Sequence, residues 1–196
     1  EAQIRLMEKL KNHSGRNSML VMRPADSRAT VECWRLAMEN THTPSALILS
    51  RQTIEDLPAG TPYAGIQHGA YVVTESDADY DIILLGNGSE VSTLVAGARL
   101  LRQDGVKTRV VSVPSEGLFR EQPQDYQQSI IPAGSKIFGL TAGLPVNLSS
   151  FLIGADPASR VWGLESFGFS APYKVLDQKL GFTAENVYNQ VKEMLA

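Results

Sequence analysis

The fold of this chain is decided at residues 81–105, which read DIILLGNGSEVSTLVAGARLLRQDG. Residues 81–86 form a short, mostly apolar run, which is typical of a strand buried in a parallel sheet. After a turn of small residues, Ser89 is placed to cap a helix over residues 90–104, whose apolar residues repeat with the 3.6-residue period of a helix. Gly105 then ends this helix. A buried strand, a tight turn and an amphipathic helix form the repeating unit of a doubly wound α/β domain.

Strands and helices continue to alternate from this unit to the end of the chain. We expect an edge strand at 70–73, further strands at 108–114, 136–140 and 160–164, a short helix near 125–130, and two closing helices capped by Ser170 and Thr183. These elements predict a mostly parallel, doubly wound sheet in a domain of residues 69–196.

Residues 1–56 are predicted to be the last β-α-β part of a second α/β domain. They begin with a helix at 1–11, in which apolar residues recur at helical spacing: Ile4, Met7 and Leu10, with Leu6 beside them. A strand at 18–23, a helix at 27–40 capped by Asp26 and a strand at 46–49 follow, a length that fits a right-handed parallel crossover. Residues 57–68 lack periodicity and contain several helix and strand breakers, so we expect them to link the two domains.

Arg51 is the first candidate for a functional residue. It comes directly after the predicted strand at 46–49, and ligands of open α/β sheets bind just beyond the carboxyl ends of parallel strands. Its guanidinium is planar and always charged, which suits a phosphate or a carboxylate. The structural alternative is an ion pair between Arg51 and a neighbouring acid.

The turn containing Gly86, Gly88 and Ser89 is a second, weaker candidate. It follows a strand and opens a helix, which is the geometry that binds anions through free backbone N–H groups. However, Val91 stands where a dinucleotide-binding turn has its third glycine, and no P-loop lysine is present. The alternative is a turn that needs small residues only for close packing.

No catalytic or metal-binding constellation is evident. The three histidines, His13, His42 and His68, lie apart without metal-ligand spacing, and we expect them in surface loops. The single cysteine, Cys33, lies in a helical pattern and is interpreted as a packed thiol. We therefore predict no catalytic residue, no metal ligand and no cofactor-binding residue in this chain.

Charge and hydropathy exclude two classes of function. The net charge is −3, with acidic and basic residues interspersed, so no basic stripe supports nucleic-acid binding. No apolar run approaches the length that crosses a bilayer. We expect a globular protein that binds neither nucleic acid nor membranes.

Several motifs, taken in order, resemble the transketolase family. They are Val21-Met22-Arg23-Pro24-Ala25-Asp26, Leu49-Ser50-Arg51-Gln52, Gly69-Ala70-Tyr71-Val72, Gly88-Ser89-Glu90-Val91, Arg109-Val110-Val111-Ser112-Val113-Pro114, Phe167-Gly168-Phe169-Ser170-Ala171-Pro172 and Gly181-Phe182-Thr183-Ala184-Glu185-Asn186-Val187. The resemblance covers the whole chain but only the C-terminal part of the family's architecture, namely the end of the pyrimidine-binding domain and the C-terminal domain.

The resemblance implies a cytoplasmic, homodimeric enzyme of the pentose phosphate pathway. Family members use thiamine diphosphate and a divalent metal, Mg or Ca, to transfer a two-carbon ketol unit between sugar phosphates. The arginine of the Leu-Ser-Arg-Gln motif binds the substrate phosphate, and Arg51 matches it. The thiamine diphosphate domain and the rest of the pyrimidine-binding domain precede the matched region. We therefore expect this chain alone to be inactive and to bind no cofactor.

Two other readings remain. The chain could be a stand-alone, non-catalytic α/β module, either a split-subunit partner or an anion binder at residues 86–90. It could also be a nucleotide-dependent oxidoreductase, but Val91 argues against this reading, and so does the lack of an acid after the second strand, where a ribose would need one. The linker at 57–68 and a helical pattern that is already under way at residue 1 favour a fragment of a longer transferase.

Overall fold

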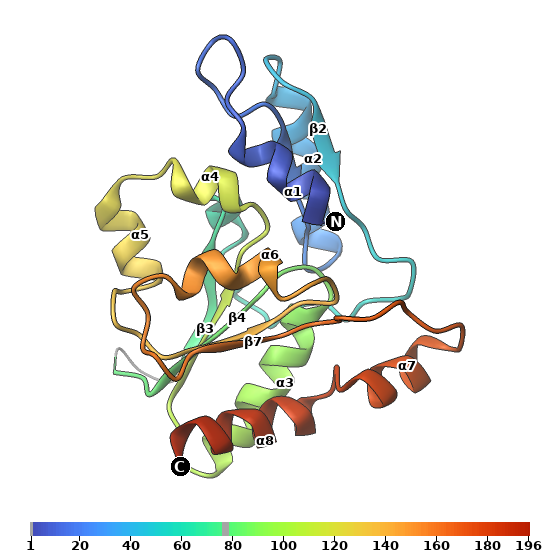
Figure 1. Ribbon diagram of the computed structural model, residues 1–196, viewed down its shortest axis with the longest axis vertical. Helices are drawn as coiled ribbons and strands as arrows, with labels where there is room; N and C mark the ends of the chain where they lie inside the picture. The colour runs from blue at the N-terminus through green and yellow to red at the C-terminus, as the bar shows by residue number, and fades with distance from the viewer. Residues whose placement is uncertain (1, 76–78) are drawn as a thin grey trace.

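The computed structural model describes residues 2–75 and 79–196 and contains two sheets (Figure 1). The smaller sheet pairs β1 (Leu20–Met22) with β2 (Ser45–Leu47) in parallel, and α2 (Ser27–Glu39) connects them. Asp26 caps α2 as predicted, because its carboxylate accepts a hydrogen bond of 2.7 Å from the Ala29 N–H. The predicted β-α-β unit is therefore present in residues 20–47.

The larger sheet has five strands in the order β3-β5-β4-β6-β7. These strands are β3 (Tyr71–Glu75), β4 (Ile82–Gly86), β5 (Thr108–Ser112), β6 (Ile137–Leu140) and β7 (Arg160–Trp162). Only the edge strand β3 runs antiparallel to its neighbour, and the other pairings are parallel. The mostly parallel α/β fold predicted from the sequence is confirmed.

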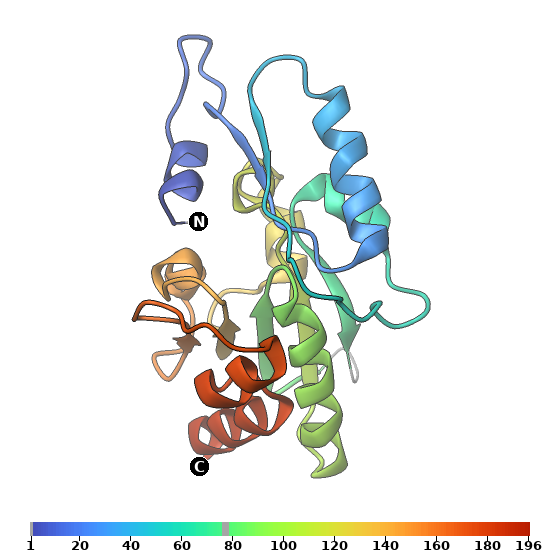
Figure 2. The same cartoon turned by 90° about the vertical axis from the view of Figure 1, so that its right-hand side faces the viewer.

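Helices cover both faces of this sheet, as a doubly wound fold requires. Ile82 and Leu84 of β4 belong to the core cluster beneath α3 (Glu90–Gln103) and α8 (Ala184–Leu195). The intervening Ile83 and Leu85 face the other cluster, which lies under α4 (Glu116–Arg120), α5 (Gln124–Ile130) and α6 (Val146–Ser149). Figures 1 and 2 show α3 and α8 side by side, away from α4 and α5. The alternation along β4 thus divides the core into two layers.

Residues 57–68, predicted to be a linker, contain the 3-10 helix η1 (Tyr63–His68). Leu57 and Ile66 are buried in the same core cluster as Ala29 of α2 and Leu94 of α3. The hydrophobic core therefore continues across this segment, while the domain boundary remains a prediction.

The first helix, α1 (Ala2–Lys9), buries a charged face and exposes its apolar residues. Arg5 and Glu8 are buried, whereas Leu6 is 59% exposed and Met7 is 41% exposed. The physical reason lies in α4, because the Glu8 carboxylate accepts a hydrogen bond of 2.6 Å from Ser115 Oγ at the start of that helix. This polar contact sets the orientation of α1. The helical spacing of its apolar residues therefore does not predict which face is buried.

Two predicted caps are wrong. Ser89 has helical dihedral angles and makes no capping hydrogen bond, and its hydroxyl donates instead to Glu90 Oε1 at 3.1 Å. The helix α7 (Tyr173–Leu180) begins after Pro172, without a side-chain cap, so Ser170 lies outside it. Thr183 does cap α8, accepting from the Asn186 N–H at 3.2 Å.

Four short helical elements were absent from the sequence prediction: η1, α4, α6 and the 3-10 helix η2 (Ser150–Leu152). In the part of the chain that the structure describes, no helix combines the length and the apolar character needed to cross a bilayer.

Candidate functional site

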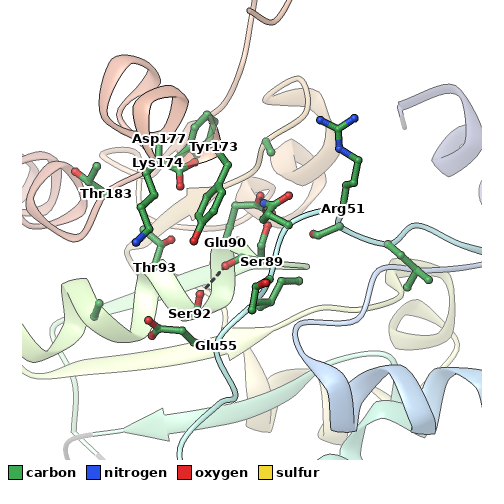
Figure 3. A pocket seen from close by; sticks show the side chains of 18 of the residues that line it. Arg51, Glu55, Ser89, Glu90, Ser92, Thr93, Tyr173, Lys174, Asp177 and Thr183 are labelled. Atoms are coloured by element: carbon green, nitrogen blue, oxygen red, sulfur yellow. Dashed lines mark hydrogen bonds between the residues drawn. The ribbon is translucent and has the colours of Figure 1, made fainter. Parts of the chain in front are cut away.

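A cleft of about 570 Å³ lies between the loop that follows β2 and the amino-terminal ends of α3, α7 and α8. Arg51 and Glu55 line it from the loop, Ser89 and Thr93 from the start of α3, and Lys174 from α7 (Figure 3). The cleft thus joins three segments that are far apart in the sequence. Part of it lies beyond the carboxyl end of β4, where α/β folds bind ligands.

Arg51 is exposed at the edge of this cleft, and its guanidinium points away from Ser89 and Glu90 in Figure 3. Within residues 2–75 and 79–196, Arg51 has no hydrogen-bond or ion-pair partner. The structural alternative, an ion pair with a neighbouring acid, is therefore not formed among these residues. A guanidinium without a partner is available for an anionic ligand.

The second arginine near the cleft, Arg23, is buried and fully engaged. Its guanidinium forms a bidentate ion pair with the Glu90 carboxylate, with an Nη2 to Oε1 distance of 3.0 Å, and donates to Asn87 Oδ1 at 2.7 Å. These bonds join the end of β1 to the start of α3. A charged pair that is removed from water needs such complete hydrogen bonding to be tolerated.

The turn of Gly86, Gly88 and Ser89 packs directly against Arg23. The Gly88 N–H donates to the Arg23 carbonyl at 3.2 Å, and Gly88 has a φ of +61°. A Cβ atom at Gly88 would lie 2.6 Å from the Arg23 Cζ, so a glycine is required here for two reasons. The close contact with Arg23 explains why this turn needs a small residue, as the close-packing alternative proposes. The anion-binding role of Gly86, Gly88 and Ser89 stays a prediction.

The opposite wall of the cleft contains Tyr173, Lys174 and Asp177, which the sequence analysis did not single out. Burial raises the pKa of the Asp177 carboxyl above its ordinary value. Lys174 is exposed, and neither Lys174 nor Asp177 forms an ion pair with any residue that the structure describes. Local sequence gave no signal for these residues, because only the tertiary structure brings α7 to the cleft that Arg51 also lines.

The histidines remain apart from the cleft. His13 and His42 are exposed, as expected. His68 is not in a surface loop, because it ends η1, its ring lies 4.8 Å from that of Tyr126, and its Nδ1 lies 2.9 Å from Gln122 Oε1. In the described ranges, no three His, Cys, Asp or Glu side chains are grouped so that they could hold a metal ion.

Cys33 is buried in the core, where burial raises the pKa of its thiol to about 12. A thiol with so high a pKa is a poor nucleophile at neutral pH. This agrees with its interpretation as a packed side chain.

Comparison with known proteins gives matches over nearly the whole chain. Residues 69–183 match the family model described as the transketolase-like TK C-terminal domain. Transketolases of Staphylococcus epidermidis and Staphylococcus aureus are each 36% identical over 180 residues, or 90% of this chain and 27% of theirs. The chain therefore spans about a quarter of the length of these relatives.

Solved structures give the same result. The transketolase from Leishmania mexicana superimposes with a TM-score of 0.85 at 34% identity, over 98% of this chain and 26% of that chain. A protein described as a split gene transketolase, inactive beta4 tetramer, shares the fold with a TM-score of 0.72 at 20% identity, over 98% of this chain and 61% of that chain.

Proposed function

The chain belongs to the transketolase family, whose C-terminal portion it matches, and from this premise we propose that it acts as part of a ketol transferase. The complete enzyme would transfer a two-carbon ketol unit between sugar phosphates as a cytoplasmic homodimer. Its thiamine diphosphate and divalent metal would supply the carbanion chemistry. We assign the cofactor site to the rest of the complete enzyme, because this chain matches only the C-terminal portion of the family.

Within this enzyme we propose that Arg51 binds the phosphate group of the sugar substrate. The observation that supports this role is a guanidinium at the edge of a cleft, in the loop that follows the parallel strand β2, without a partner among the described residues. Its fork of donors matches two phosphate oxygens. Arg23 cannot take this role without losing its pair with Glu90.

The test is Arg51→Ala in the complete enzyme, assayed with phosphorylated and unphosphorylated ketose donors. Loss of a hydrogen bond to a charged group is worth about 1.5–3 kcal/mol, so we expect KM for the phosphorylated donor to rise roughly tenfold or more. KM for the unphosphorylated donor should change little. In the same assay, the isolated chain should show no turnover.

Arg99→Ala serves as the matched control, since Arg99 is exposed on α3 and does not line the cleft. It should leave both KM values unchanged. Equal losses for both donors in Arg51→Ala would instead assign Arg51 a structural role. Arg51→Lys should give an intermediate KM, because a lysine keeps the charge but loses the bidentate geometry.

A second candidate is a separate subunit that assembles with a thiamine diphosphate subunit. It is favoured by the fold match to the split-gene protein. This chain covers a larger part of that protein than of the other transketolases compared above. In both cases the partners are a thiamine diphosphate domain, the rest of the pyrimidine-binding domain and a second copy of the enzyme. Co-purification of this chain with a separately encoded thiamine diphosphate subunit would distinguish this arrangement from a continuous polypeptide.

A further inference from the structure

We propose that Asp26 is a positioning residue for Arg51, an inference that rests on the phosphate-binding role proposed above. Asp26 is 2% exposed, and its carboxylate accepts three hydrogen bonds. Oδ1 accepts from the Ala29 N–H at 2.7 Å, whereas Oδ2 accepts from the Leu57 N–H at 2.9 Å and from the Tyr63 hydroxyl at 2.5 Å. Capping α2 requires only the first of these bonds.

The bond from the Leu57 N–H holds the carboxyl end of the loop that contains Arg51, and the bond from Tyr63 joins η1 to the same carboxylate. This loop leaves β2 at Ile48, whose N–H donates to the Met22 carbonyl at 2.9 Å, and it returns at Leu57. Between these anchors, residues 49–55 form no hydrogen bond to any described residue. The position of Arg51 therefore depends on how the two ends of the loop are fixed.

Two further contacts help to fix the second end. Ser27 Oγ donates to Asp56 Oδ1 at 2.8 Å, and the Leu57 side chain is buried in the core. The first contact is exposed and the second is not directional, so neither fixes the backbone as strictly as the buried bond from Leu57 to Asp26. Asp26 thus connects the start of α2, the Arg51 loop and η1 through one side chain.

The two carboxylate oxygens of Asp26 make different contacts, so one contact can be removed while the other is kept. An asparagine at position 26 can still cap α2 through Oδ1, because asparagine is as good a cap as aspartate. Its Nδ2 group, however, would face the Leu57 N–H as a donor against a donor, whereas the Tyr63 hydroxyl can rotate and accept from it. Asp26→Asn should therefore release the loop without removing the cap.

The consequence for binding follows from geometry. A guanidinium that binds two phosphate oxygens must be placed accurately, and small displacements of a binding group weaken the contact strongly. In the complete enzyme, we expect Asp26→Asn to raise KM for a phosphorylated donor about tenfold. KM for an unphosphorylated donor, and kcat for both, should change by less than about twofold, because the phosphate contact alone is affected.

Asp104→Asn is a matched control with the same substitution. Asp104 also accepts a hydrogen bond from a tyrosine, Tyr188, at 2.5 Å, but this pair joins α3 to α8 and does not line the cleft. It should leave the ratio of the two KM values unchanged. If Asp26→Asn fails to fold, Tyr63→Phe decides instead, since it removes only one donor to Oδ2 and should raise the phosphorylated-donor KM about threefold.

A double-mutant cycle separates the possible outcomes. If Asp26 acts through Arg51, Asp26→Asn should have no further effect on KM in the Arg51→Ala background. An undiminished effect in that background, or equal changes for both donors, would overturn the positioning role while leaving Arg51 as the phosphate ligand. If Arg51→Ala itself does not distinguish the donors, the proposed function of Arg51 fails and the positioning role fails with it.

Discussion

Glu8 is a charged residue in a buried position. Burial raises the pKa of its carboxyl above the ordinary value of 4.5, although the hydrogen bond from Ser115 and the backbone N–H of Gly117 partly offset this effect. Below about pH 4.5 the carboxyl is protonated in the folded and the unfolded chain alike, so no charge is buried. As the pH rises toward the raised pKa, the unfolded chain loses its proton first, and the stability of the fold decreases.

We therefore predict that Glu8→Gln makes the free energy of unfolding less dependent on pH. The stability difference between the variant and the natural chain should shift in favour of the variant as the pH rises from 4.5 to 7.5. Urea unfolding at several pH values measures this difference. Glu165→Gln is the control, because Glu165 is exposed, and its stability difference should stay constant. A constant difference for Glu8→Gln too would contradict the burial argument.

The sequence predicted individual residues well only where local rules decide their role. Asp26 and Thr183 cap helices as expected, because each precedes a helix in extended conformation. Ser89 has the same chemistry but helical dihedral angles, which its residue type does not reveal. Lys174 and Asp177 could not be predicted to line the cleft, since they reach it only through the packing of α7.

At the scale of elements, the helices α1 and α3 have similar apolar content, but a leucine is exposed in α1 and buried in α3. Leu94 of α3 is fully buried between the sheet and α8, whereas Leu6 of α1 is 59% exposed. The first 3.6-residue pattern predicted a buried face correctly, because α3 lies between two buried parallel strands in the sequence. The second pattern did not, because a buried hydrogen bond from Ser115 to Glu8 orients α1.

Leucine-to-alanine substitutions test this difference with one chemistry at two positions. Leu94→Ala should lower the free energy of unfolding by about 2–5 kcal/mol, since it leaves a cavity in a packed core. Leu6→Ala should change it by less than about 0.5 kcal/mol, as is usual at a surface position. Thermal or urea unfolding of this chain measures both values. A loss of several kcal/mol in Leu6→Ala would mean that α1 packs its apolar face after all.

The strands were easier to predict than the short helices. Buried parallel strands such as β4 consist of continuous apolar residues between turn signals, so their pattern is visible in one sequence. The helices α4 and α6 have five and four residues, which is too short for a helical period to be recognised. Their positions are set by the tertiary structure, in which they cover the second face of the sheet.

At the scale of the whole molecule, the segments before and after residues 57–68 share one core. Met22 and Ala29 lie in the same buried cluster as Val110 and Leu94. The buried Arg23–Glu90 pair and the hydrogen bond of 2.9 Å from the Arg23 N–H to the Pro114 carbonyl cross the same boundary. Breaking such contacts separately would expose apolar surface and leave a buried charge unpaired, so the two parts should unfold together.

The two tryptophans allow this cooperativity to be measured, since Trp34 lies in α2 and Trp162 in β7, on opposite sides of the predicted boundary. Each of the single-tryptophan variants Trp162→Phe and Trp34→Phe is unfolded in urea and followed by tryptophan fluorescence and by circular dichroism. In each variant we expect the fluorescence midpoint to equal the circular-dichroism midpoint. If Trp34 reports an earlier transition than the circular dichroism, residues 20–47 unfold as a separate unit. Coincident transitions would mean that α2 and the C-terminal sheet belong to one cooperative structure, stabilised by the core cluster that they share.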